Sequence, residues 1–165
     1  MKIGLLSDTH GTLTEDMLAY FKNCDEIWHA GDIGHQEVID KLQAVKPLRA
    51  VYGNIDDASI RAQFPEEAIF TVEGLDVYII HIGGYPPKYT SKLKKRLAEI
   101  EPGLFICGHS HILKVMPDKE RNLLHMNPGA AGNHGFHKMR TMLRFSVSDG
   151  LVKDLELIEL GKRGT

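Results

Sequence analysis

Short apolar segments that each end in a polar loop, with amphipathic segments between them, most constrain how this chain can fold. The first half contains three such segments, at residues 3–6, 26–30 and 48–52. Between the second and the third, Val38 and Leu42 share the apolar face expected of a helix. A strand followed by a helix and then by another strand is typical of parallel pairing with crossover helices. We therefore expect an α/β fold whose first half forms a parallel sheet.

The second half of the chain has a different pattern. Residues 70–80 predict a hairpin that turns near Glu73-Gly74, and further hairpins are expected over 114–124 and 142–160. A lysine-rich helix over 89–100 precedes a short buried strand at 104–107. The sheets should therefore contain mixed or antiparallel parts as well as parallel ones.

Length and composition are those of one ordinary globular domain spanning residues 1–165. The chain is 42% hydrophobic and 25% charged, with a formal net charge of −2, and no basic stripe suggests general nucleic-acid binding. Cys24 and Cys107 lie in apolar surroundings, which favours buried free thiols in a reducing compartment. No apolar run reaches the length of a membrane span or signal peptide. We expect a soluble, cytoplasmic protein without membrane partners.

Polar side chains that can bind metals follow the predicted strands. In chain order these are Asp8, His10, Asp32, Asn54, His81, His109 and His111. From Asp8 the steps between successive strand ends are 24, 22, 27 and 28 residues, each close to one strand–helix–strand unit of about 30 residues. Because groups at the carboxyl ends of strands meet in one crevice of an open α/β sheet, we expect these side chains to share a pocket.

Two carboxylates, one amide and four imidazoles are too many donors for one ion, which takes about four to six protein and water ligands. Two ions sharing a carboxylate would use the set fully, and Asp32, midway in the list, is the candidate bridge. These donors favour manganese, iron, cobalt, nickel or zinc over calcium. The charge of two divalent ions exceeds that of two aspartates and one hydroxide by +1. This excess favours binding of an anion such as phosphate. Ions ~3.5–4 Å apart suit in-line attack on a phosphate ester.

The same residues resemble the signature of the calcineurin-like metallophosphoesterases. The family pattern is Asp-x-His, Gly-Asp, Gly-Asn-His-Asp/Glu, His and Gly-His-x-His, in that order. Here it reads Asp8-Thr9-His10, Gly31-Asp32, Gly53-Asn54-Ile55-Asp56, His81 and Gly108-His109-Ser110-His111. The likeness covers about residues 3–132 and ends in Asn127-Pro128-Gly129, a segment that small prokaryotic members carry. Each element is weak alone, but five in this order are specific.

The resemblance implies a fold, a metal centre and a reaction. The fold would be α/β, a four-layer αββα sandwich with two central mixed β-sheets flanked by helices. One ion would be held by Asp8, His10, Asp32 and His111, and the other by Asp32, Asn54, His81 and His109. The activity would be hydrolysis of a small phosphodiester, or another phosphate ester, by a metal-bridging hydroxide. Asp32 and Asn54 would be the catalytic residues, and manganese is preferred to nickel, iron, cobalt or zinc.

One position departs from the family pattern. Ile55 stands where many members have a histidine that contacts the phosphate and helps to protonate the leaving group. General acid catalysis contributes about 10²–10⁴-fold, so esters with poor leaving groups should suffer most. Either His134 or His137 could replace the missing donor, although an exposed loop is the simpler interpretation of both. His29 is expected behind the site as a buried partner of the ligands.

Two alternatives stay open, one for the function and one for the assembly, and one charged run has a simple interpretation. The chain could be a scaffold that kept the fold and lost turnover, as in the retromer subunit that resembles this family. The run Lys92, Lys94, Lys95 and Arg96 is interpreted as a solvated helix face. A homodimer or homotetramer is also possible.

Overall fold

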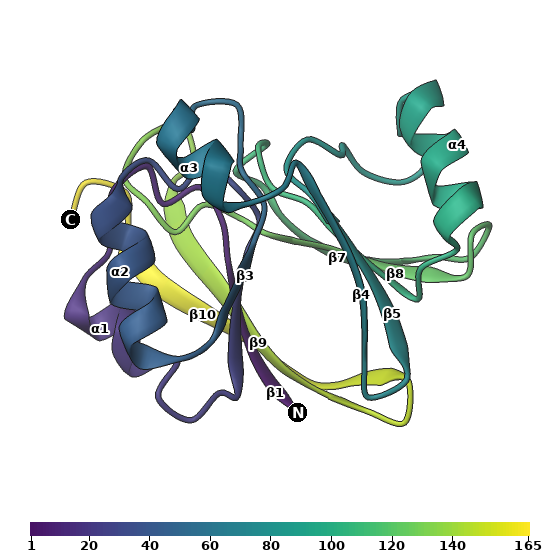
Figure 1. Ribbon diagram of the computed structural model, residues 1–165, viewed down its shortest axis with the longest axis horizontal. Helices are drawn as coiled ribbons and strands as arrows, with labels where there is room; N and C mark the ends of the chain where they lie inside the picture. Colours follow the sequence, from purple (N-terminus) through teal and green to yellow (C-terminus); the bar gives the residue numbers. More distant parts are fainter.

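Two five-stranded sheets lie face to face at the centre of the computed structural model, which describes residues 1–165 (Figure 1). The first sheet has the order β10-β9-β1-β2-β3. Its strands are β1 (Lys2–Leu6), β2 (Glu26–His29), β3 (Leu48–Ala50), β9 (Met139–Ser148) and β10 (Leu151–Lys162). β1, β2 and β3 are parallel, whereas β9 runs antiparallel to both β1 and β10. The parallel half is therefore built from the start of the chain, as the sequence predicts.

The second sheet has the order β4-β5-β6-β8-β7. Its strands are β4 (Glu67–Val72), β5 (Leu75–Ile80), β6 (Leu104–Ile106), β7 (Leu113–Asp118) and β8 (Leu123–Pro128). The central strands β5, β6 and β8 are parallel, and the outer strands β4 and β7 are antiparallel to their neighbours. The three predicted hairpins are confirmed as β4–β5, β7–β8 and β9–β10, and both sheets are mixed.

Four helices cover the outer faces of the two sheets. They are α1 (Glu15–Ala19), α2 (Gln36–Val45), α3 (Ala58–Gln63) and α4 (Ser91–Ile100). Apolar side chains of α1, α2 and α3 pack on the first sheet, and those of α4 pack on the second. Figure 1 shows α1, α2 and α3 on one side of the molecule and α4 on the other. The four-layer αββα sandwich is confirmed.

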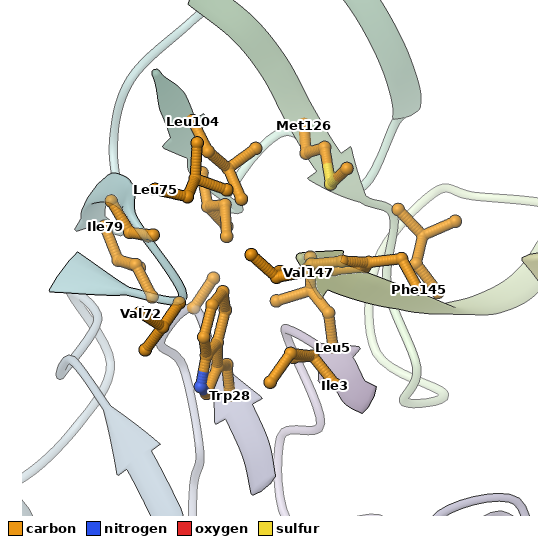
Figure 2. Close-up of a cluster of buried hydrophobic side chains, with 14 of the residues drawn as sticks. Ile3, Leu5, Trp28, Val72, Leu75, Ile79, Leu104, Met126, Phe145 and Val147 are labelled. Atoms are coloured by element: carbon orange, nitrogen blue, oxygen red, sulfur yellow. The ribbon is translucent and has the colours of Figure 1, made fainter. Parts of the chain in front are cut away.

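The apolar side chains between the sheets form one cluster that includes Trp28, the only tryptophan (Figure 2). Its ring meets that of Phe70 edge to face at 5.1 Å between centroids and that of Phe145 at 5.8 Å. Aromatic pairs of this kind contribute about 0.5–1.5 kcal/mol beyond the burial of their area. Trp28 thus ties the second sheet, through Phe70, to the first.

The helix boundaries follow from local chemistry. The Thr14 and Thr90 hydroxyls accept hydrogen bonds from the first turns of α1 and α4, so α4 begins two residues after the predicted start at 89. The Asp57 carboxylate caps α3 in the same way. The sequence interpretation did not include α3, which is only six residues long. No helix of the chain has the length and apolar character needed to cross a membrane.

Candidate metal centre

All seven predicted site residues lie at one end of the sandwich, in loops that follow the carboxyl ends of β1, β2, β3, β5 and β6. Five of them have left-handed backbone angles: Asp8 (φ 53°), His10 (φ 44°), Asp32 (φ 54°), His109 (φ 67°) and His111 (φ 60°). Residues other than glycine rarely adopt this region, and such strain gathers where a structure must aim side chains at a site. The strained backbone of these loops thus directs the candidate ligands toward one site.

A first cluster is formed by Asp8, His10 and His111. Asp8 Oδ2 accepts hydrogen bonds from the Ser7 hydroxyl at 2.6 Å and from the His109 backbone N–H at 3.1 Å. Asp8 Oδ1 accepts none and lies 3.1 Å from His111 Nε2. His10 Nε2 is also buried without a hydrogen-bond partner, 3.9 Å from Asp8 Oδ1. Unpartnered buried polar atoms cost free energy, and a divalent cation bound between them would satisfy both.

A second cluster contains Asp32, His81 and His109, with Asn54 beside them. Asn54 Oδ1 lies 2.9 Å from His109 Nδ1 and 3.1 Å from His81 Nε2. His81 Nδ1 lies 2.7 Å from the Ala30 carbonyl, to which it donates, so His81 Nε2 is free to bind a metal. Two imidazoles, a carboxylate and an amide oxygen are donors suited to a transition metal.

Asp32, a member of the second cluster, also faces the first cluster. Its Oδ2 is 3.2 Å from His81 Nε2 and 3.5 Å from His10 Nε2, one nitrogen from each cluster. Its Oδ1 accepts a hydrogen bond from the Ile55 backbone N–H at 3.0 Å, which fixes the orientation of the carboxylate. A single Asp32 oxygen therefore faces both candidate ion positions.

The pKa shifts reflect concentrated negative charge. Burial disfavours a charged imidazole, yet Asp32 and Asp8 outweigh burial and raise the pKa of His81. Burial would raise the pKa of Asp32, but the hydrogen bond and charge of His81 lower it. At His10, by contrast, burial dominates over both aspartates and lowers the pKa. The carboxylates thus attract positive charge that bound cations would supply in place of protons.

His29 lies behind the site, as predicted, and contacts the loops that carry the candidate ligands. The Gly31 N–H donates to His29 Nδ1 at 3.1 Å, so Nε2 carries the proton that is donated to the Thr9 hydroxyl at 3.0 Å. Burial lowers the pKa of His29 to about 4, which keeps the ring neutral near pH 7. His29 therefore links the Asp8 loop to the Asp32 loop without adding charge.

Asp56 is the supporting residue to which the sequence analysis gave no role. Its buried carboxylate accepts three backbone hydrogen bonds, from Gly53 and Gly34 at 2.8 Å and from Ile33 at 3.1 Å. These N–H groups belong to the loops of Asn54 and Asp32. The signal was present, since Asp56 ends the Gly53–Asp56 motif, but no spacing rule reveals which N–H groups a carboxylate will meet.

The two histidines of the 133–137 loop have different surroundings. His137 Nε2 lies 2.9 Å from the Gly132 carbonyl, and His137 Nδ1 lies 3.3 Å from His111 Nδ1. Both nitrogens of His137 are engaged, so it orients His111 rather than serving a substrate. The exposed His134 ring stacks on His10 at 4.7 Å between centroids and makes no hydrogen bond. Of the two, only His134 is free to meet a substrate.

Comparison with known proteins identifies the family. Residues 1–150 match the family described as the calcineurin-like phosphoesterase superfamily domain. The chain belongs to this superfamily. A probable metallophosphoesterase of Methanocaldococcus jannaschii is 31% identical over an alignment that covers 96% of this chain and 82% of that protein. The superfamily assignment thus holds over nearly the whole chain.

Solved structures share the fold of this phosphoesterase domain. An archaeal phosphodiesterase superimposes with a TM-score of 0.79 at 22% identity, covering 97% of this chain and all of that one. Vps29 of Entamoeba histolytica, in complex with Zn²⁺, superimposes with a TM-score of 0.75 at 16% identity over 96% of this chain and 99% of that one. The layers of this calcineurin-like domain are therefore those of known members.

Proposed function

We propose that this calcineurin-like phosphoesterase is a phosphodiesterase that works with two divalent transition-metal ions, manganese foremost. The observation that carries the proposal is the position of Asp32 Oδ2, 3.5 Å from His10 Nε2 and 3.2 Å from His81 Nε2. A carboxylate oxygen shared by two donor clusters is what a pair of ions requires. The solved archaeal phosphodiesterase of the same fold supports diesters as the substrate class.

The donors divide between the ions as the two clusters do. One ion would be held by Asp8, His10 and His111, and the other by His81, His109 and Asn54. Asp32 would bind both ions. When bound, such a pair lowers the pKa of a coordinated water to about 7 and offers positive charge to the oxygens of a phosphoryl group for in-line displacement. The protein contributes orientation. Ser7 and Ile55 donate hydrogen bonds to Asp8 and Asp32, and the Ala30 carbonyl accepts one from His81 Nδ1.

The leaving group has no strong proton donor. Ile55, at the usual histidine position, is 45% exposed at the mouth of the site and cannot donate. His134 is the free histidine nearby, stacked on His10. We expect aryl esters, whose leaving groups depart without a proton, to react faster than alkyl esters. Ile55→His should narrow this gap by raising the rate on alkyl esters, within the ~10²–10⁴-fold range of general acid catalysis.

The test is metal-dependent hydrolysis of bis-p-nitrophenyl phosphate. The purified protein is stripped with chelator, titrated with Mn²⁺ while bound metal is counted, and assayed at each ratio. We expect activity to rise with the second equivalent, and p-nitrophenyl phosphate to be the poorer substrate. Asp32→Asn should abolish turnover, whereas Asp16→Asn, a matched change in the exposed first turn of α1, should not.

The alternative function is a binding scaffold without turnover. A scaffold has no need of the complete donor set, and this chain carries all seven of its residues. Folded protein that binds manganese but releases no nitrophenol would favour the scaffold. Full activity with one equivalent of metal would contradict the two-ion proposal while leaving the esterase intact.

A further inference from the structure

Two clefts open on the candidate metal centre and meet at Asn54. The first, which we call the helix cleft, has a volume of about 670 Å³, is lined by residues of α3 and α4, and reaches Asn54 and His81. The second, the loop cleft, has a volume of about 480 Å³ and runs from His10 and His109 to the 133–137 loop. Figure 1 shows α3 and α4 on either side of the loops at this end of the sheets. A diester has two substituents on its phosphorus, and this site offers a separate cleft to each.

The helix cleft has unpaired positive charge. Of its four cationic side chains, only Arg96 is paired with carboxylates, those of Glu67 and Glu99. Arg61 donates to the backbone carbonyls of Asp56 and Asn54, so its charge is not neutralised. Lys92 and Lys95, the other two cations, have no carboxylate within ion-pair distance.

Acidic residues do not cancel this excess. Glu67 is held by Arg96 and also accepts from the Tyr78 hydroxyl at 2.8 Å. Glu99 lies 3.3 Å from Arg96, which leaves Glu66 as the one unpaired acid of the lining. The lining has four cations and three carboxylates, so its net charge is +1. Because Lys92 and Lys95 lie outside every ion pair, the helix cleft is attractive to an anion.

The loop cleft has the opposite character. It contains no lysine or arginine, and its outer wall carries Ile55, Ile112 and Phe136, which are 45%, 62% and fully exposed. Exposed apolar side chains beside a catalytic pocket favour an uncharged, apolar or aromatic group. The two clefts therefore differ in which substituent of a diester they would accept.

We propose that the helix cleft binds a substituent that bears a second phosphate, so that the substrates are phosphodiesters with an additional phosphate on one arm. This rests on the proposed function, since the scissile phosphate would lie at the metal centre. Lysine and arginine are the side chains that most often donate hydrogen bonds to phosphate groups in proteins. The additional charge is recognised by Lys92 and Lys95, with Arg61 at the inner end of the cleft.

Helix α4 shows why these lysines are more than a solvated surface. Leu93 and Leu97 are buried against the second sheet. Lys92 and Lys95 line the helix cleft, whereas Lys94, equally exposed on the same helix, does not. Lys92 and Lys95 are exposed, as expected of a solvated face, but they also line the helix cleft, and Lys94 provides a matched control.

The experiment compares two aryl diesters that differ only in the second phosphate. These are the p-nitrophenyl ester of thymidine 5′-phosphate and the same ester with a 3′-phosphate, assayed with the manganese-loaded protein. We expect the 3′-phosphate to lower KM about tenfold at low ionic strength, with kcat unchanged. The double variant Lys92→Ala/Lys95→Ala should lose this preference, and Lys94→Ala should keep it.

A binding measurement separates this proposal from the activity itself. Calorimetry with thymidine 3′,5′-bisphosphate and thymidine 5′-phosphate, on the same loaded proteins, needs no turnover. Tighter binding of the bisphosphate that disappears in the double variant supports the cleft even if no ester is hydrolysed, in which case only the proposed function fails. Hydrolysis without any preference for the 3′-phosphate, or a preference that survives in the double variant, overturns the cleft and leaves the phosphodiesterase standing.

Discussion

Asp56→Asn tests whether one buried carboxylate holds the metal loops together. Asp56 Oδ2 accepts from the N–H groups of Ile33 and Gly53, and its Oδ1 accepts from that of Gly34. Asparagine has the same shape, and its amide oxygen can keep the first two hydrogen bonds. Its NH₂ group then faces the Gly34 N–H, donor against donor. The variant therefore removes one hydrogen bond and the negative charge with little change in volume.

The expected loss of stability follows from these contacts. A hydrogen bond to a charged group contributes about 1.5–3 kcal/mol, and a buried donor without a partner costs about 1–3 kcal/mol. Allowing for relaxation, we expect the free energy of unfolding to fall by about 2–4 kcal/mol. Domains are stable by only about 5–15 kcal/mol, so the change is large. With a urea m-value of about 1–3 kcal/mol/M, the urea midpoint should fall by about 0.7–4 M.

Urea unfolding can be followed through the fluorescence of Trp28, which is fully buried between the sheets. The matched control is Asp57→Asn, because Asp57 caps α3 by accepting from Ile60 N–H and asparagine caps equally well. Asp56→Asn should also weaken manganese binding about 10–100-fold, as is typical of residues behind metal ligands. A loss below about 0.5 kcal/mol, or one equal to that of Asp57→Asn, would refute the reasoning.

The residues that converge on the site were predictable because topology determines where strand ends lie. Once residues 3–6, 26–30 and 48–52 are interpreted as parallel strands, Asp8, Asp32 and Asn54 must follow at one edge of the sheet. The four-layer arrangement was not visible in periodicity and came from the family resemblance. Parallel pairing alone does not say how two sheets stack.

Three features could not be predicted from the sequence: helix α3, the helix cleft and the hydrogen bonds of Asp56. Each depends on contacts between segments that are distant in the sequence or too short to show a period. The six residues of α3 are too few for a helical period, so neither the helix nor the adjoining cleft was expected. Helical spacing shows that Lys92 and Lys95 lie away from the core, but not that α3 and Asn54 line the same cleft. The three hydrogen bonds of Asp56 likewise arise from a loop fold without a sequence period.

Three further substitutions test other parts of the structure. Gly53→Ala would place a Cβ 2.0 Å from Asp32 Oδ1 and displace this carboxylate, so the metal-dependent kcat should fall about 10²-fold. An unchanged kcat would show that the added methyl group does not displace Asp32. His137→Phe removes the His137 Nδ1 atom that lies against His111 Nδ1, so one metal equivalent should bind about 10–100-fold more weakly in calorimetry. Unchanged affinity for both equivalents would show that His137 does not support His111. His125 concerns pH, because burial lowers its pKa to about 4 from the 6.5 of an exposed imidazole. Since the unfolded chain binds this proton first, His125 should reduce stability as the pH falls from 6.5 towards 4 and cost nothing above that range. Glutamine cannot titrate. Between pH 7 and pH 4.5, the free energy of unfolding of His125→Gln, measured in urea, should therefore fall by about 2 kcal/mol less than that of the wild type. If the two proteins show the same dependence of stability on pH, His125 is not the group responsible.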